Sequence, residues 1–260
     1  MTEIWSATTG VARGHRLTLI HGSLDRSAGL LKLSRRLDDR YLITRYDRRG
    51  YGRSAPHEGP FGLDEQVDDL RAVLDRAGGR AAVQVLVAHS YGGNVALALA
   101  QRHPGLVDGV VVYETPLSWR EWWPGDSAGA DAVAWRADPE LAAERFMRRL
   151  ISDDRWERLP ASTRASRRSE GRAMVAELLD LRARPAWDGA QIDLPVMAMH
   201  GEFGADHHRV GAETIASEIA GAELVVLPGG RHPGPNTHPD DVAKLVDEFI
   251  ARRVAPTTPA

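Results

Sequence analysis

The residue whose surroundings in the sequence point most clearly to a chemical role is Ser90, which lies in the segment AHSYGG of residues 88–93. Residues 83–87 before it form a short apolar run rich in β-branched side chains, which predicts a buried strand. Residues 94–101 after it predict a helix that ends before Pro104. A sharp turn from strand into helix strains the serine backbone, exposes its Oγ and brings the free N–H groups of a helix N-terminus close. The segment therefore predicts a nucleophile, with a purely structural turn as the alternative.

A histidine near the end of the chain is the predicted general base for this serine. His232 lies in the glycine-rich loop 229–234, between the last predicted strand and the last predicted helix. An imidazole titrates near neutral pH, so it can take the serine proton and return it to a leaving group. The alternative is a loop histidine without a catalytic role. His238 precedes Pro239 and is expected to cap or pack at the final helix instead.

The elements that must position these residues alternate along the chain. Strands are expected at 16–20, 41–46, 83–87, 107–113, 196–199 and 223–227, and helices at 30–37, 63–76, 94–101, 140–151, 171–184, 210–219 and 239–253. Alternating apolar strands and helices predict an α/β protein with a mostly parallel, doubly wound sheet. Since sites in such sheets form at the carboxyl ends of strands, we expect Ser23, Ser90, Glu114 and His232 to gather there.

Several short blocks of this chain, taken in order, resemble the α/β-hydrolase family. They are HG at 21–22, DRRGYGRS at 47–54, the turn around Ser90, MHGE at 199–202 and GGRH at 229–232. The resemblance implies an α/β-hydrolase fold whose core comprises residues 1–117 and 191–255. Residues 118–190 match no motif, carry most of the tryptophans and are expected to form a helical cap with an apolar pocket beneath it. Residues 256–260 are expected to form a flexible tail.

The acid that would orient His232 has two candidates. Most of the family places it about three residues after the glycine of the late HG pair, where this chain has Gly204. Asp206 follows two residues later. Glu114 directly follows the predicted strand 107–113, and some branches of the family, including certain haloalkane dehalogenases, take their acid from the end of this strand. We favour Glu114, because its strand is expected beside the one that carries Ser90, and the alternatives are Asp206 or a site without an acid.

The resemblance also implies an oxyanion hole made of two backbone N–H groups. One belongs to Tyr91, the residue after the nucleophile, and the other to Ser23 or Leu24 in the loop after the first HG pair. Backbone donors leave little trace in a sequence, so this assignment depends on the resemblance. His21 is expected to organise that loop rather than to act as a catalyst.

The amino-acid composition of the chain limits the kinds of binding partner that we expect. The chain has 260 residues, a formal net charge of −3 and no cysteine, which gives no reason to expect binding to nucleic acid or to an anionic membrane and excludes thiolate catalysis. No export signal or long apolar run is visible, so we expect a soluble, cytoplasmic protein. We expect a small-molecule substrate, and the sequence leaves a homodimer open.

Neither a cofactor nor a metal is expected. His200, Asp206, His207 and His208 lack the spacing of a metal motif. Residues 50–55 fit a dinucleotide-binding pattern, but Pro56 and Pro60 prevent the helix that would hold a pyrophosphate.

The combined features predict a cofactor-independent serine hydrolase of an ester or related acyl bond, acting through Ser90, His232 and Glu114. Two other classes stay open: a non-hydrolytic enzyme on the same fold, such as a lyase or a perhydrolase or haloperoxidase, and a ligand receptor with little turnover. Dehalogenase and epoxide-hydrolase activities are disfavoured, since those branches need a nucleophilic aspartate where this chain has Ser90.

Overall fold

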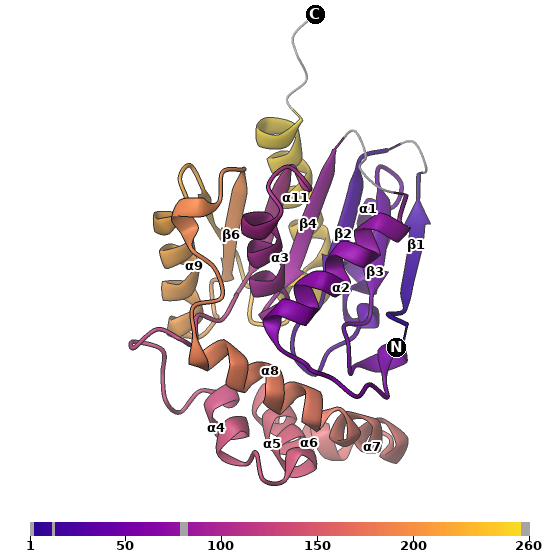
Figure 1. Ribbon diagram of the computed structural model, residues 1–260, viewed down its shortest axis with the longest axis vertical. Coiled ribbons are helices and arrows are strands. Elements are labelled where there is room, and N and C mark those ends of the chain that lie inside the picture. Colours follow the sequence, from indigo (N-terminus) through magenta and orange to yellow (C-terminus); the bar gives the residue numbers. More distant parts are fainter. Residues whose placement is uncertain (1–2, 12–13, 79–82, 256–260) are drawn as a thin grey trace, which may run out of the picture.

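The computed structural model describes residues 3–11, 14–78 and 83–255, and these residues form one seven-stranded sheet flanked by helices (Figure 1). The strand order is β1-β3-β2-β4-β5-β6-β7, with β1 antiparallel to β3 and every other pairing parallel. The predicted α/β class with a mostly parallel sheet is confirmed. The predicted tail 256–260 lies outside the described residues.

The strands are β1 (Ser6–Gly10), β2 (Arg16–Ile20), β3 (Leu42–Tyr46), β4 (Gln84–His89), β5 (Gly109–Tyr113), β6 (Val196–Gly201) and β7 (Glu223–Leu227). The α-helices are α1 (Leu31–Leu37), α2 (Leu63–Arg76), α3 (Tyr91–Arg102), α4 (Ala128–Ala134), α5 (Pro139–Ile151), α6 (Asp153–Glu157), α7 (Ala161–Ser169), α8 (Gly171–Ala183), α9 (Asp206–Glu218), α10 (Gly234–Thr237) and α11 (Pro239–Phe249). Short helical turns η1 (Ser27–Leu30), η2 (Gly52–Ser54), η3 (Gly189–Gln191) and η4 (Ile250–Val254) complete the elements.

The strand β1 is absent from the strands that the sequence predicted, as are α4, α6, α7 and α10 from the predicted helices. Its residues SATTG carry no large apolar side chain, and most of them are exposed or half-buried at the sheet edge. Such a strand has no inward-facing apolar alternation, which is the signal that sequence patterns depend on. It pairs with β3 through backbone hydrogen bonds, from Ser6 opposite Tyr46 to Gly10 opposite Leu42.

The core lies in two layers, one on each face of the sheet. Side chains of α2, α3 and α9 pack on one face, and side chains of α1 and α11 pack on the other. The interior strand β5 is buried at every residue, which explains its continuous apolar sequence GVVVY. Burial of one such Val or Leu side chain contributes roughly 1.5–3 kcal/mol, so the two layers hold the strand ends rigidly.

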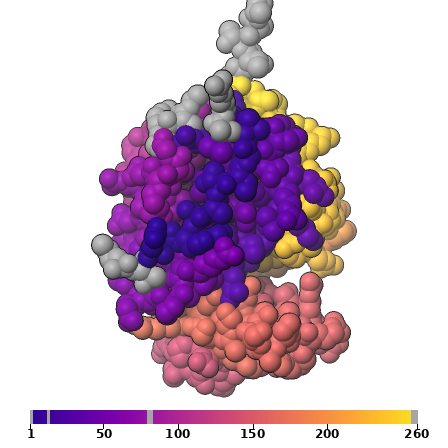
Figure 2. Space-filling view, turned by 90° about the vertical axis from the view of Figure 1, so that its right-hand side faces the viewer, coloured from indigo at the N-terminus to yellow at the C-terminus, as the bar shows by residue number. Residues whose placement is uncertain are grey.

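Helices α4 to α8 lie between β5 and β6 in the chain and sit below the sheet in Figure 1. Figure 2 shows them, in pink to orange, as a lobe beneath the core. A buried ion pair joins this helical lobe, which we refer to as the cap, to the core: Arg48 Nη1 lies 2.7 Å from Glu177 Oε2, with both side chains fully buried. Tyr51 also donates its hydroxyl to Glu177, at 2.7 Å. Within the described segments no helix is long and apolar enough to cross a membrane.

Candidate active site

Ser90 lies between β4 and α3 in a backbone conformation that residues with a side chain rarely adopt. Its φ is 54° and its ψ is −128°, a strained combination that costs about 1–3 kcal/mol and persists only where the surroundings enforce it. Ser90 N–H donates to the carbonyl of Tyr113 at 2.8 Å, and the Ser90 carbonyl accepts from Gly93 N–H at 2.9 Å. The strand, tight turn and helix expected around Ser90 are therefore present.

Three glycines make the close approach at this turn possible. A Cβ at position 92 would lie 2.7 Å from the carbonyl oxygens of Ile20 and His21. One at position 93 would lie only 1.8 Å from Thr115 Oγ1. Gly22 lets the loop after β2 pass beside the serine, because a Cβ there would lie 2.9 Å from Ser90 Cβ. The small residues of both blocks are thus required by contact between β2, β4 and α3.

Glu114 and His232 form a direct contact at the carboxyl end of the sheet. Glu114 Oε2 accepts a hydrogen bond from His232 Nδ1 at 2.7 Å, while Oε1 accepts from Gly201 N–H at 3.0 Å. Glu114 is 1% exposed, and its φ of 47° turns the chain sharply at the end of β5. Because the carboxylate holds a proton on Nδ1, the other ring nitrogen of His232 is left to accept one.

The alternative acid, Asp206, lies elsewhere. Helix α9 begins at Asp206 rather than at residue 210, and the Asp206 side chain is 96% exposed, with its nearest basic partner Arg209 at 3.7 Å. Position 204 itself has no room for a carboxylate, since a Cβ on Gly204 would lie 2.3 Å from Glu114 Oε1. Of the two candidates that the sequence left open, Glu114 is the one that contacts His232.

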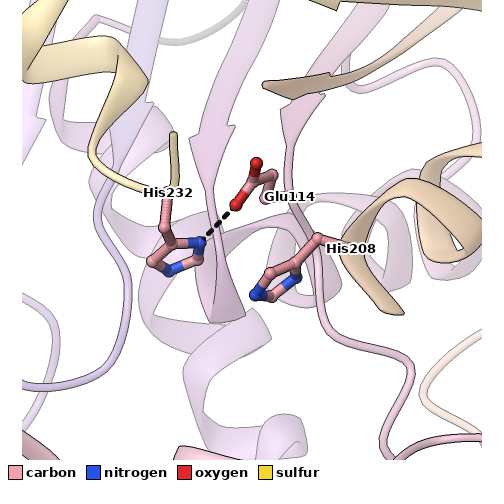
Figure 3. A group of neighbouring side chains, drawn as sticks. All are labelled: Glu114, His208 and His232. Carbon is pink, nitrogen blue, oxygen red and sulfur yellow. Dashed lines mark hydrogen bonds and ion pairs between the residues drawn. The ribbon is translucent and has the colours of Figure 1, made fainter. Parts of the chain in front are cut away.

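Two further histidines, His208 and His89, lie next to His232, and Figure 3 shows the first of them. The His208 ring stacks on that of His232 with centroids 4.6 Å apart and planes inclined by 17°. His89 Nε2 donates to the His232 carbonyl at 2.9 Å. Burial, and then the charge of His232, lowers the pKa of His89 to about 3 and holds the pKa of His208 well below its ordinary value. Both neighbours are thus neutral near pH 7 and add no positive charge beside His232.

The loop after β2 carries Ser23 and Leu24, which have different surroundings. Ser23 lines the same cavity as Ser90, whereas the Leu24 side chain is 2% exposed and packs among apolar residues of the cap. Leu24 has a φ of 48°, so the loop bends sharply there. Tyr91 is the first residue of α3, and its N–H therefore has no acceptor within the helix. These positions are compatible with donors from both segments.

His21 and the Tyr91 ring are engaged in packing. His21 Nδ1 donates to the Gly22 carbonyl at 2.8 Å, and its Nε2 accepts from Arg48 N–H at 2.9 Å. Both ring nitrogens are used, and burial together with the charge of Arg48 lowers the His21 pKa well below its usual value. The Tyr91 ring lies 4.7 Å from the Arg48 guanidinium. His21 therefore organises the loop, as expected from the sequence.

A cavity between the sheet and the cap contains both Ser90 and His232. Its lining combines hydroxyl, imidazole, guanidinium and apolar groups: Ser23, Ser90, Pro116, Ser118, Trp123, Ser127, Ala128, Gly129, Phe146, Leu150, Leu178, Arg182, His207, His208 and His232. Trp123 lines this cavity, while Trp119 stacks edge-to-face on Trp187 at 5.7 Å. The walls thus combine apolar side chains with hydroxyl, imidazole and guanidinium groups.

Sequence reasoning missed His208 and Arg182 as parts of this cavity. The sequence shows His208 only as part of a histidine cluster without metal-motif spacing, and its contact with His232 joins a helix to a distant loop. Arg182 is one of many arginines on the predicted cap helices. No local pattern distinguishes it, since its place in the cavity depends on how α8 lies against the core.

One group of side chains has the composition of a metal site. The ligating atoms of Glu114, His208 and His232 lie within 4.8 Å of one another, although the Nδ1 of His232 is already bonded to Glu114.

The segment 50–55, which fits a dinucleotide-binding pattern in the sequence, binds a carboxylate of the protein itself: Asp47 Oδ2 accepts from Arg53 N–H at 2.9 Å. That negative charge would repel a pyrophosphate.

The sequence matches the alpha/beta hydrolase family over residues 19–245. The chain belongs to this family. It is 30% identical to a 2-hydroxymuconate semialdehyde hydrolase of Pseudomonas sp. strain CF600, over 79% of this chain and 75% of that protein. It is 28% identical to a pimeloyl-[acyl-carrier protein] methyl ester esterase of Aromatoleum aromaticum, over 64% of this chain and 73% of that protein. It is therefore a hydrolase of the α/β type.

Three other similarities support narrower conclusions about this chain. A protein named as a carbamate hydrolase in Caulobacter segnis is 35% identical, but the match spans only 38% of each chain. A solved α/β hydrolase from Sphaerobacter thermophilus is 25% identical and superposes with a TM-score of 0.68 over 95% of this chain and 96% of that one. An esterase from Thermogutta terrifontis, 23% identical, has a TM-score of 0.73 over 96% of this chain and 93% of that one, which shows the shared fold.

Proposed function

We propose that the protein hydrolyses an ester or related acyl bond of a small, largely apolar molecule through a Ser90-His232-Glu114 triad and an acyl-enzyme. The observation that carries this proposal is the 2.7 Å hydrogen bond from His232 Nδ1 to Glu114, in a histidine that shares one cavity with the strained Ser90. The named esterase and hydrolase relatives support the reaction class.

The chemistry follows from the positions of the donors and acceptors. Ser90 Oγ attacks the substrate carbonyl while His232 Nε2 takes its proton, and Glu114 stabilises the imidazolium that forms. The N–H of Tyr91, with that of Ser23 or Leu24, stabilises the oxyanion. His232 then protonates the leaving alcohol, and a water molecule activated by His232 releases the acid from Ser90. No step requires a group beyond these side chains, the backbone and water.

Labelling by a fluorophosphonate tests the nucleophile. The probe should modify Ser90 in the wild-type protein, and Ser90→Ala should abolish labelling and lower ester turnover by at least about 10⁴-fold, as loss of a triad nucleophile does. Ser23→Ala is a matched control, because Ser23 lines the same cavity and offers only its backbone N–H in this mechanism. Labelling that persists in Ser90→Ala would contradict the proposal.

Assays of the wild-type protein distinguish the proposed hydrolase from the two alternative classes of protein. A receptor would bind ester analogues with negligible turnover in the wild type. A perhydrolase or haloperoxidase would need an added peroxide for product formation, whereas the proposed reaction needs only water. A burst of alcohol release followed by a slower steady rate, one equivalent per Ser90, would support the acyl-enzyme.

A further inference from the structure

One arginine of the cavity wall lacks a counter-charge. Arg182, near the end of α8, is partly buried and lines the cavity with Ser90 and His232. Its Nη1 donates to the Leu178 carbonyl at 3.1 Å, and its Nη2 reaches Ser127 Oγ only at 3.5 Å. No carboxylate of the described residues lies within ion-pair distance of it. A guanidinium has five N–H donors, so most of its hydrogen-bonding capacity is left unused by the protein.

Arg184, two residues further on, shows what an ordinary arginine of this segment does. It pairs with Asp64 at 2.8 Å, and that pairing raises its pKa. Burial instead lowers the pKa of Arg182, and no neighbouring acid offsets that effect. A buried cation without a partner is costly, and such groups concentrate at functional sites.

Other polar atoms of the same wall also lack partners. The hydroxyl of Ser118 and Nδ1 of His208 are buried without a hydrogen-bond partner among the described residues, and both residues line the cavity. None of the described lining residues is an aspartate or a glutamate. Gly129 leaves room beside the guanidinium, since a Cβ there would lie 3.1 Å from Arg182 Nη2. The cavity therefore offers one uncompensated positive charge and unused polar groups alongside apolar side chains.

We infer that the substrate carries a carboxylate in addition to the scissile ester, and that Arg182 binds it. This inference rests on the proposed hydrolysis at Ser90 and names its substrate class. The planar fork of a guanidinium matches a carboxylate through two parallel hydrogen bonds. The apolar side chains of Phe146, Leu150 and Leu178 suit the hydrocarbon segment between the two groups. Arg182 selects the substrate by its charge, whereas Ser90 and His232 carry out the reaction.

Paired esters that differ only in charge test this inference. Monomethyl glutarate has a free carboxylate, which dimethyl glutarate masks as a second ester. The wild type should prefer the monoester in kcat/KM by at least about tenfold, the discrimination of one good charged contact of about 1.4 kcal/mol. Arg182→Gln should reduce this preference by about tenfold or more, mainly through KM for the monoester. Arg184→Gln is the matched control and should keep the wild-type preference.

The outcomes separate the two proposals. Equal kcat/KM for both esters in the wild type, or a preference that survives in Arg182→Gln, would overturn the role of Arg182 while Ser90 labelling and turnover leave the hydrolase proposal intact. Binding of glutarate to Ser90→Ala protein, measured by calorimetry, adds a test without turnover. Binding that is lost on adding Arg182→Gln supports the anion site, and its persistence would refute it. Absence of Ser90 labelling and of turnover on both esters would instead refute the hydrolase proposal.

Discussion

The change Glu114→Gln tests the most specific part of the site, because it keeps the shape and removes one acceptor. The carboxylate accepts two hydrogen bonds, from Gly201 N–H at 3.0 Å and from His232 Nδ1 at 2.7 Å. An amide has only one oxygen. If that oxygen stays on Gly201 N–H, the amide NH₂ faces His232 and forces the proton from Nδ1 to Nε2. The imidazole can then no longer accept the serine proton.

The opposite orientation of the amide is also unfavourable. It would direct the NH₂ group at Gly201 N–H, leaving buried donors without acceptors at a cost of about 1–3 kcal/mol. A free-energy cost of about 1–3 kcal/mol for keeping the productive His232 tautomer corresponds to a loss of roughly 5- to 150-fold in rate. Loss of the carboxylate charge beside the imidazolium adds to it, and the replacement of a triad acid by its amide lowers turnover about 10⁴-fold, or about 5.4 kcal/mol in activation free energy. We expect a loss of that size in kcat for Glu114→Gln.

Initial rates on a short-chain ester give the measurement, and NMR gives an independent readout of the tautomer. The wild type should show a low-field imidazole proton from His232 Nδ1–H that disappears in Glu114→Gln. Glu202→Gln makes the same chemical change at an exposed residue whose carboxylate accepts from Gly229 N–H, and it should change kcat by no more than about twofold. If Glu114→Gln keeps more than about a tenth of wild-type kcat, the assigned role of Glu114 is wrong.

Three further results are expected. Acid should destabilise the fold below about pH 6.5, because the pKa values of His89 and His208 are lowered in the folded state and ordinary in the unfolded state. Each buried imidazole therefore contributes stability that is present above the unfolded pKa. This stability is lost as the pH falls, at roughly 1.4 kcal/mol per pH unit. Urea titrations at pH 7 and pH 5 measure this, and a His208→Phe protein with an unchanged slope would contradict it. Gly204→Asp should lower activity and melting temperature, because its Cβ would lie 2.3 Å from Glu114 Oε1, and combining it with Glu114→Ala should restore part of the activity; a fully active, stable single variant would show that the segment yields freely. Glu177→Gln should lower the free energy of unfolding by about 3–5 kcal/mol, because it leaves a fully buried guanidinium uncompensated, and a loss below about 1 kcal/mol in urea would show that water or another acceptor replaces the carboxylate.

The parts of the fold that the sequence predicted are those with a strong local signal. The turn at Ser90 and the buried strand β5 both follow from short-range patterns, and β5 does lie beside β4, with His89 opposite Tyr113. The sequence could narrow the acid that bonds His232 to two candidates only, since the partners Glu114 and His232 lie 118 positions apart in the chain. The hydrogen bond of Glu114 to His232 and the exposure of the Asp206 side chain decide between those candidates, and no sequence pattern reports either.

Features that depend on how elements far apart in the chain pack together were beyond sequence reasoning. The stacking of His208 on His232 needs the first turn of α9, and that helix begins at Asp206 rather than at residue 210. The isolation of Arg182 is a property of its surroundings, because a missing carboxylate partner has no local signature. The arginines that do find partners, such as Arg184, look the same in the sequence.

The buried Arg48 couples the cap mechanically to the loop beside the serine. Its guanidinium donates to the carbonyls of His21 and Gly22, each at 3.0 Å, and also binds Glu177 of the cap helix α8. A cap that lifted as a rigid lid would have to break these bonds or pull that loop away from Ser90. Opening of the cap and displacement of the loop beside Ser90 would therefore be one coupled motion, since the same guanidinium holds both.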